Sequence, residues 1–465
     1  MKTLKFACLT IIAALSSSLN AQTSYETARL IGEDLNGTAR FIGMGGAMSA
    51  FGSDISTIST NPAGIGTYKK SDANISISFI GTKTSMDSPG NGPTHYYSND
   101  NKTAFRTGFE NVSFVLHNPI NNQWRALKSF NFAFTYKKVR DFEKSISYFD
   151  DFIDKNSYQV YRDFENTEEG RINSYNFNFS FNYFDQIFWG LTVGMLDANY
   201  WANGYFYDYY PIQSGFTQVT DYTSVDRMNE FYGHGWNLRL GVLLRPIVSS
   251  SFRIGLSLST PTWFSMTQGY SDYLYALEGV EKDGILFSDI TDYKVTTPWE
   301  FNISTGITIS DSWAIGAEYE VTAAERTNII VNGFYIDNQN RHDLQPFSTY
   351  KVGLEKNIGL LSIRAGYNYI LPTFKSSAYK DLDNTDFNKN RFDFDFENSG
   401  KQHNITFGLG YCSEPGRFGD QFYIDAAYVH SIRKSAFSVG EYNDDPVVDY
   451  TTSRRKLVLT AGFLF

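Results

Sequence analysis

The 465-residue sequence has only two cysteines, and after residue 21 it has no apolar run of the roughly 18 residues that a membrane-spanning helix needs. Helical membrane spans are therefore excluded. Cys8 lies in a segment that we expect to be removed, so Cys412 has no partner for an intrachain disulfide. The net charge of -10 argues against nucleic acid as a partner, because nucleic-acid binding requires a basic surface.

Motifs of catalysis and of cofactor or metal binding are also missing. The histidines have no metal-ligand spacing, and the glycines at 43–46 do not open a helix after a strand, as a dinucleotide site requires. Asp381, Asp383 and Asp386 resemble part of a calcium loop, but its glycine and final glutamate are absent. No catalytic motif surrounds His430. We therefore expect no catalytic residues, no metal, no cofactor and no enzymatic activity.

The first 21 residues have the form of a secretory signal peptide. Two lysines precede a short apolar run at 6–15, and Ala21 supplies a small residue before the cut. A lipidated cysteine is the alternative, but Cys8 lies ahead of most of the apolar run, where no lipidation cut would fall. We expect an exported mature chain that begins at Gln22.

Aromatic residues are abundant, and 39 Phe, 32 Tyr and 7 Trp make up 17% of the chain. From residue 73 onward, apolar and polar residues alternate in segments of about ten residues, the length of a tilted strand that crosses a bilayer. The fourteen segments are 73–83, 109–117, 129–138, 173–183, 187–197, 233–245, 251–260, 298–309, 313–321, 347–356, 360–370, 402–412, 421–432 and 454–465. The alternation predicts an all-β fold, a transmembrane antiparallel β-barrel of about 14 strands.

The connections between these segments alternate in length. Short links follow the even-numbered segments, and long polar links, which we interpret as loops, follow the odd-numbered ones. This alternation is typical of outer-membrane barrels, with both termini on the periplasmic side, and a soluble sandwich gives no reason for it. Because unpaired backbone groups are not tolerated in hydrocarbon, the first and last strands must pair.

The last segment ends at Phe465, and a terminal aromatic resembles the signal that bacterial barrel-assembly machinery recognises. We expect this machinery, outer-membrane lipid and lipopolysaccharide as partners, and a monomer in the cell outer membrane of a Gram-negative bacterium.

The face opposite the lipid-facing residues carries glycines and charges. Glycine in a strand marks a bend or the close approach of another group, so the glycines indicate either an occupied lumen or barrel curvature. These glycines are Gly190, Gly194, Gly241, Gly255, Gly306, Gly316, Gly353, Gly366, Gly408 and Gly410. Four bases on this face, Arg239, Arg253, Lys351 and Arg364, are candidate ligand-binding residues because each could hold a carboxylate head group. The alternative is that they pair with neighbouring acids.

The stretch 36–68 differs from the rest of the chain because it is rich in Gly, Ala and Ser and has neither strand alternation nor a helical stripe. Its apolar residues argue against a disordered tail. A fourteen-stranded barrel is wide enough to need filling. We expect residues 22–72 to form a plug, called the hatch from here on, inside a barrel formed by residues 73–465.

Within this stretch, GTAR at 37–40, GMGGA at 43–47, Asp54 and NPAG at 61–64 resemble the hatch of the FadL/TodX family. Members of that family are outer-membrane transporters of long-chain fatty acids and aromatic hydrocarbons. The resemblance implies passive transport of hydrophobic small molecules, with capture in a loop-side pocket, a shift in the hatch and exit through the wall. It assigns a gating role to Asn61, Pro62, Ala63, Gly43, Gly45, Gly46 and Asp54.

The long connections depart from the family pattern, because they are polar and lack the hydrophobic helical stretches expected of fatty-acid importers. This departure favours an alternative function within the same superfamily, in which the barrel serves protein secretion or surface assembly.

Overall fold

A computed structural model describes residues 24–86, 103–120, 126–153, 159–214, 217–247, 249–278, 281–310, 312–335, 338–380, 395–396, 399–438 and 447–465. The expected signal peptide at 1–21 and the acidic segment at 381–386 lie outside the described residues. No described helix is long and apolar enough to cross a membrane.

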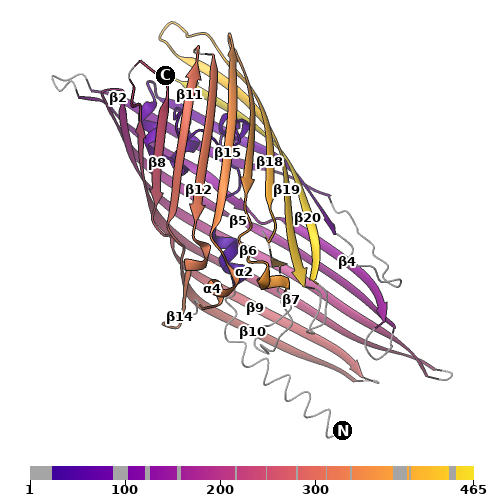
Figure 1. The fold of residues 1–465 in the computed structure, drawn as a ribbon. Helices are drawn as coiled ribbons and strands as arrows, with labels where there is room; N and C mark the ends of the chain where they lie inside the picture. Colours follow the sequence, from indigo (N-terminus) through magenta and orange to yellow (C-terminus); the bar gives the residue numbers. More distant parts are fainter. Residues whose placement is uncertain are drawn as a thin grey trace.

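The described strands form one antiparallel sheet that closes into a barrel of fourteen crossings (Figure 1). In chain order they are β1 (Asp72–Met86), β2 (Thr103–Pro119), β3 (Leu127–Asp141), β4 (Lys144–Ile153), β5 (Gln159–Tyr183), β6 (Ile187–Ser214), β7 (Thr217–Leu244), β8 (Arg253–Ser259), β9 (Trp263–Glu278), β10 (Glu281–Thr296), β11 (Glu300–Ile309), β12 (Trp313–Thr322), β13 (Asn328–Val331), β14 (Phe334–Tyr335), β15 (Phe347–Ile358), β16 (Leu361–Ile370), β17 (Asp395–Phe396), β18 (Gln402–Cys412), β19 (Gln421–Ser438) and β20 (Val447–Leu464). The barrel closes where β1 pairs with β20, from Asp72 opposite Leu464 to Met86 opposite Tyr450. All fourteen expected segments overlap these strands, so the predicted barrel is confirmed.

Two neighbouring crossings are each divided into two strands by a proline. Pro261 separates β8 from β9, and Pro298 separates β10 from β11. Proline has no backbone N–H to donate to a ladder, so strand pairing is interrupted at both residues. Thr262 and Thr297 bridge the gap, because the Thr262 N–H donates to the Thr297 hydroxyl over 2.8 Å.

The long connections differ from the expected loops, because much of their length continues the strands. β6 and β7 have 28 residues each and pair along their whole length. At about 3.3 Å per residue, each spans on the order of 90 Å, well beyond a hydrocarbon core of about 30 Å. The expectation of loops at 198–232 is therefore wrong. Tyr, Phe, Thr and Val are frequent there, and these residues favour strands even when polar residues intervene.

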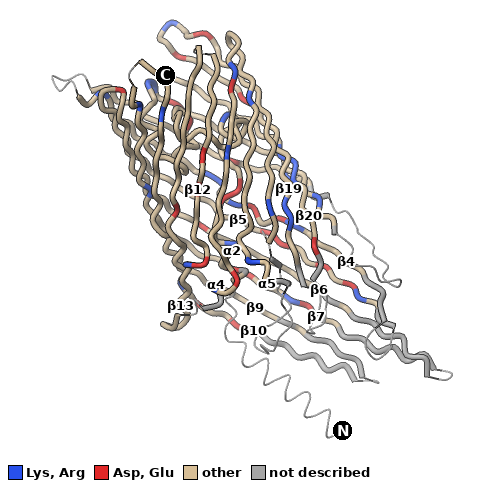
Figure 2. Tube along the Cα trace, viewed as in Figure 1, with Lys and Arg blue, Asp and Glu red and all other residues tan. Residues whose placement is uncertain are grey.

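The outer face of the wall is apolar, as the alternation predicts. On β18, Ile405, Phe407 and Leu409 are 42%, 57% and 63% exposed, whereas the intervening Thr406 is fully buried. Between β3 and β5, four opposed aromatic pairs have ring centroids 5.0 to 5.5 Å apart: Phe130–Phe181, Phe132–Phe179, Phe134–Phe177 and Tyr136–Tyr175. Figure 2 shows long stretches of wall strand without charge, and Lys and Arg positions that follow one another along β19 and β20.

The chain ahead of β1 lies inside the barrel, as the hatch prediction requires. It contains α2 (Ser24–Leu30), α3 (Ala39–Gly43) and two 3-10 helices, η1 (Ile55–Ser59) and η2 (Pro62–Thr67). Figure 1 shows α2 within the outline of the barrel beside α4 (Asn338–Asp343), and the Ser24 hydroxyl donates to the Asp343 carboxylate over 2.7 Å. The rest of the hatch runs towards the short-turn end, where β1 begins.

Two smaller elements lie at the opposite end of the barrel from the short turns. η3 (Ala324–Arg326) follows β12, and α5 (Ser377–Lys380) follows β16. Ala324 and Ala378 pack in one buried cluster with Ala28 and Ile31 of the hatch. These elements therefore help to cover the start of the hatch.

Candidate functional site

The hatch backbone lies directly against the wall glycines. A Cβ atom added at Gly255 would lie 2.7 Å from the Asn61 amide nitrogen, and one at Gly306 would lie 2.9 Å from the Phe51 ring. At Gly353 and Gly366 the added atom would meet hatch backbone at Met44 and Gly45. Of the ten glycines predicted to face the lumen, all but Gly194 and Gly410 have hatch atoms among their nearest neighbours. The hatch therefore occupies the lumen. Of the two interpretations of these glycines, an occupied lumen and barrel curvature, the structure supports the first.

Gly43 and Gly45 of the hatch lie against wall backbone, and an added Cβ at Gly43 would lie 3.1 Å from the Gly408 Cα. Gly45 and Gly46 have φ angles of +64° and +80°, in the left-handed region that favours glycine. A Cβ atom at Gly45 would also lie 2.8 Å from the backbone nitrogen of Tyr367. The Thr406 hydroxyl donates to the Gly43 carbonyl over 3.0 Å and attaches this turn to β18.

Asp54 joins two turns within the hatch. Its carboxylate caps η1 by accepting the Ser56 N–H at 2.9 Å, and it also accepts the Thr38 hydroxyl at 2.7 and 2.9 Å. Thr38 in turn caps α3, because its oxygen accepts the Phe41 N–H. A short polar side chain at the first position of each turn satisfies N–H groups that a helix start leaves unpaired.

The Asn61–Pro62–Ala63 turn is bonded to two wall strands. The Asn61 side-chain oxygen accepts the Ala63 N–H at 3.1 Å, and its amide donates to the Val242 carbonyl of β7 at 3.2 Å. The Pro62 carbonyl accepts hydrogen bonds from Asn178 and Ser180 of β5, both at 3.3 Å. All three residues of the turn are buried. Asn61 therefore caps η2 and anchors it to the wall.

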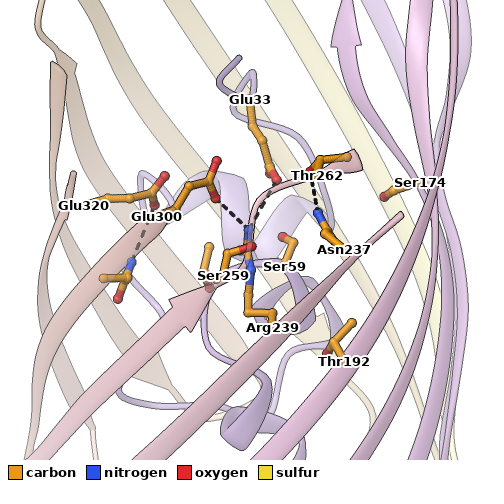
Figure 3. A network of polar contacts seen from close by, with 12 residues as sticks. Glu33, Ser59, Ser174, Thr192, Asn237, Arg239, Ser259, Thr262, Glu300 and Glu320 are labelled. Atoms are coloured by element: carbon orange, nitrogen blue, oxygen red, sulfur yellow. Dashed lines mark hydrogen bonds and ion pairs between the residues drawn. The ribbon is translucent and has the colours of Figure 1, made fainter. Parts of the chain in front are cut away.

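Three of the four candidate lumen bases pair with wall carboxylates. Arg239 lies 2.9 Å from Glu300 and 4.0 Å from Glu33 of the hatch, and Figure 3 shows its guanidinium between the two carboxylates. Lys351 lies 2.9 and 3.0 Å from Glu318 and Glu320.

Arg364 lies 2.6 Å from Glu355 and 2.5 Å from Asp425. Arg40 of the hatch also pairs with Glu355 at 3.0 Å. Burial alone would lower the pKa of Arg40, but the carboxylates of Glu355, Asp54 and Asp425 raise it. Arg253 differs from the other three, because its guanidinium donates to the Phe51 carbonyl of the hatch over 2.6 Å. A role for these four bases in ligand binding stays a prediction.

A second basic group, which the sequence analysis missed, holds the hatch segment 28–36. Arg140 of β3 donates to the carbonyls of Ala28, Arg29 and Ile31 over 2.9 to 3.0 Å, at the C-terminal end of α2. Cations are favoured there because the last carbonyls of a helix lack intrahelical partners. Lys456 of β20 donates to the Leu35 carbonyl over 2.7 Å.

Asp34 lies within the same basic group. Its carboxylate is 3.1 Å from Arg433 and 3.3 Å from Arg454. Burial alone would raise the pKa of Asp34, but Arg454, Arg433, Arg140 and Lys456 hold it below its ordinary value. Arg140 and Arg433 lie in stretches that we interpreted as loops. Lys456 directly precedes the alternating run that begins at Leu457, and this position was the available signal for a lumen-facing base.

Several cavities lined by described residues lie next to the hatch. One of about 550 Å³ lies at the short-turn end and is lined by polar and charged residues that include Arg40, Asp72, Arg253 and Asp425. Two smaller ones, of about 60 and 40 Å³, are both lined by Asp34. Among the described residues, no group of three or more His, Cys, Asp or Glu is arranged to hold a metal ion.

One junction in the wall has a short backbone ladder. β2 and β3 pair only from Asn111 opposite Lys137 to Pro119 opposite Ser129. Beyond Asn111, towards the long-strand end, β2 still pairs with β1, and β3 still pairs with β5. Within the described residues, β2 and β3 do not pair with each other there. Ion pairs span the gap: Glu110–Lys138 at 2.9 Å, Arg106–Asp141 at 3.6 Å and Arg106–Glu143. We call this junction the seam.

The fold has clear counterparts among solved structures. A FadL homologue from Pseudomonas aeruginosa superposes with a TM-score of 0.57 at 13% identity, over 93% of this chain and 99% of the other. The toluene transporter TodX of Pseudomonas putida gives 0.53 at 13% identity, and the toluene transporter TbuX of Ralstonia pickettii gives 0.52 at 15%. Both cover 93% of this chain and 99% of the other.

Sequence comparison adds no further relatives, because no family model and no curated protein matches the chain. At these identities the structural similarity is one of fold. It agrees with the hatch motifs in the sequence and with the glycine-lined wall around the hatch. The chain therefore has the fold of the FadL/TodX-type channels, a fourteen-stranded barrel that holds an N-terminal hatch.

Proposed function

We propose that the protein moves hydrophobic small molecules passively across the outer membrane of a Gram-negative bacterium. The observation that carries this proposal is the barrel with its lumen filled by the hatch, in a fold shared with two toluene transporters. The apolar outer face supports a membrane location. We further propose that residues 1–21 are a signal peptide, with the hatch at 22–72 and the barrel at 73–465.

Transport through this barrel requires movement of the hatch. Asn61 and Gly43 are hydrogen-bonded to the wall, and wall glycines leave no space beside Met44 and Gly45. A ligand that enters from the side of the long strands therefore meets hatch backbone. We propose that the turns at 43–46 and 61–63, with Asp54 between them, shift together when the ligand passes.

The seam is the place where the wall would open for the ligand. Separating β2 from β3 above Asn111 breaks the ion pairs of Arg106 and Glu110, but it breaks no backbone ladder within the described residues. Where neighbouring strands are paired, the same movement would leave backbone N–H and C=O groups unpaired in hydrocarbon, each at a cost of several kcal/mol. Phe105 and Phe109 of β2 are exposed on the outer face beside this gap and offer an apolar path towards lipid.

Cross-linking of the seam tests this route. Glu110→Cys and Lys138→Cys, in a Cys412→Ser background, would be joined by a short bis-maleimide. Uptake of labelled dodecanoate or toluene into cells that express the variant should fall after cross-linking. Asn368→Cys with Asn404→Cys is the matched control, because these residues face each other in the continuous β16–β18 ladder. Equal uptake before and after cross-linking of the seam would rule out this exit route.

A secretion or surface-assembly role is the second candidate. The observation that favours it is the length of β6 and β7, whose paired strands project far beyond a bilayer. Co-purification with a secretion complex, together with normal uptake of hydrophobic compounds after deletion of the gene, would favour this role over transport. An enzymatic role is tested by incubating the purified protein with phospholipid, and we expect no hydrolysis.

A further inference from the structure

Three bases project from the outer face of the wall where the barrel closes. Lys83 of β1, Lys434 of β19 and Arg455 of β20 are exposed, and each is followed by a buried residue. Because side chains alternate between the two faces of a strand, these three point away from the lumen. β1 and β19 both pair with β20, so the bases lie on neighbouring strands. We call them the outer basic patch.

The strand register places the three bases close together. Lys83 is opposite Ser453, two residues from Arg455 on the same face, so the two bases are diagonal neighbours about 7–8 Å apart. Lys434 is opposite Thr451, on the other side of Ser453 along β20. With strands about 4.8 Å apart and a rise of about 3.3 Å per residue, Lys434 lies roughly 12 Å from Lys83. Long, flexible side chains at these separations can reach one large head group.

The outer basic patch lies at the level of an aromatic belt. Four opposed rings on β12, β15, β16 and β18 form a row: Tyr319, Tyr350, Tyr369 and His403. Neighbouring rings in this row have centroids 4.9 to 6.4 Å apart. The row of opposed residues continues across β19 and β20 to Lys83. Aromatic belts lie at the level of lipid head groups.

The distance from the short turns agrees with this level. Lys83 is ten residues along β1 from Ala73, near the short-turn end. At a strand tilt of about 35–45°, ten residues correspond to roughly 23–27 Å along the membrane normal, and the apolar band of such a barrel is about 25 Å tall. The outer basic patch therefore faces head groups of the leaflet opposite the short turns, which is the outer leaflet.

Carboxylates are scarce around the patch. Among the described outward-facing positions of β1, β18, β19 and β20, Asp449 supplies the one carboxylate, and it lies farther from the short turns than all three bases. Within the same described part of the chain, none of the three bases forms an ion pair. The wall at β5 and β6 differs, because exposed Arg171 lies beside two exposed acids, Glu169 on its own strand and Asp197 diagonally across. The patch is thus a local excess of positive charge that an external anion can neutralise.

We propose that the outer basic patch binds the phosphate groups of lipopolysaccharide in the outer leaflet. The inference rests on the outer-membrane location proposed above. Phosphate suits these bases because charge-assisted hydrogen bonds are strong and arginine binds phosphate through two N–H groups. On the same face, nearer the short turns, Ile77 and Leu457 are exposed and would contact the acyl chains. A head group held by Lys83 and Arg455 bridges the first and last strands of the barrel.

Binding of a fluorescent lipopolysaccharide without O-antigen to the purified full chain tests the proposal, by anisotropy in a non-ionic detergent at low salt. Each base near an anionic lipid surface strengthens binding roughly fivefold, so Arg455→Gln should weaken it by about that factor. Combining Arg455→Gln with Lys83→Gln and Lys434→Gln should weaken it on the order of 100-fold. Arg171→Gln is the matched control, because it removes an exposed base that lies beside acids, and binding should change less than about twofold. Heat-modifiable gel mobility shows that each variant is folded.

Removing the phosphates from the lipopolysaccharide separates the effect of charge from that of the acyl chains. Wild type should bind the dephosphorylated probe as weakly as the triple variant binds the intact one. Phosphatidylglycerol should not compete at equal concentration, because its single phosphate cannot contact three bases at once. Equal losses in Arg455→Gln and Arg171→Gln, undiminished binding of the dephosphorylated probe, or equal competition by phosphatidylglycerol would each overturn the proposal.

The location in the outer membrane is tested separately by cell fractionation. If wild type is recovered with the outer membrane and takes up toluene, but does not bind lipopolysaccharide, only this inference fails. Recovery of wild type in the soluble periplasmic fraction would contradict the proposed location itself.

Discussion

Replacing Gly366 by alanine puts a methyl group where the hatch backbone already lies. The three nearest atoms to the added Cβ belong to the backbone of Met44 and Gly45, so no side chain can rotate away to make room. Overpacking of this kind costs about 1–3 kcal/mol. The wall is fixed by its ladders to β15 and β18. The hatch must therefore move, and the population with a displaced hatch should rise by roughly 5- to 150-fold.

Sugar permeation in a liposome-swelling assay measures this displacement. We expect Gly366→Ala to swell faster than wild type, while heat-modifiable gel mobility shows that the barrel remains folded. Gly81→Ala is the matched control, because an added Cβ at this wall glycine meets nothing within 4 Å. Equal swelling of the two variants, both folded, would refute the inference that wall glycines exist to accommodate the hatch.

Three further outcomes follow from the hatch contacts. Asn61→Ala removes the cap of η2 and the bond to Val242, a loss of about 1–2 kcal/mol, so uptake should change while the barrel stays folded. Unchanged uptake would exclude a gating role. Arg140→Gln weakens the bonds to three hatch carbonyls, and limited proteolysis should then cut the chain before Asp34 at least several-fold faster than in wild type. Because the pKa of Asp34 is below its ordinary value, its contribution to stability is present above the unfolded pKa of about 3.9 and is lost as pH falls through the folded value. The difference in protease protection of the hatch between wild type and Asp34→Asn should therefore be constant from about pH 8 to 5 and should shrink as pH falls below about 4.

The sequence predicts the barrel because the two-residue alternation of apolar side chains can be recognised within each strand separately. Ile405, Phe407 and Leu409 alternate with polar residues or glycine whatever the rest of the chain does, and the same pattern recurs in other crossings, such as β3 and β5. Glycines on the opposite face suggested an occupied lumen before any contact was known. Their partners, such as Met44 for Gly353, lie hundreds of residues away and required the structure.

The basic residues around Asp34 were missed for a different reason. Arg140 and Arg433 lie towards the end of the barrel opposite the short turns, where the apolar half of the alternation fades in the sequence. The sequence therefore predicts loops there, although the strands continue. Sequence composition alone also gave no way to distinguish a base that meets ligand from one that meets a wall carboxylate, such as Lys351 beside Glu318.

Ion conductance in a planar bilayer tests most directly whether the hatch closes the barrel. The full-length protein should show no lasting conductance steps, because wall glycines and the hatch backbone are in close contact. A variant that lacks residues 24–68, and that retains heat-modifiable mobility, should conduct in large, stable steps. Similar conductance of the two folded proteins would contradict a lumen closed by the N-terminal segment.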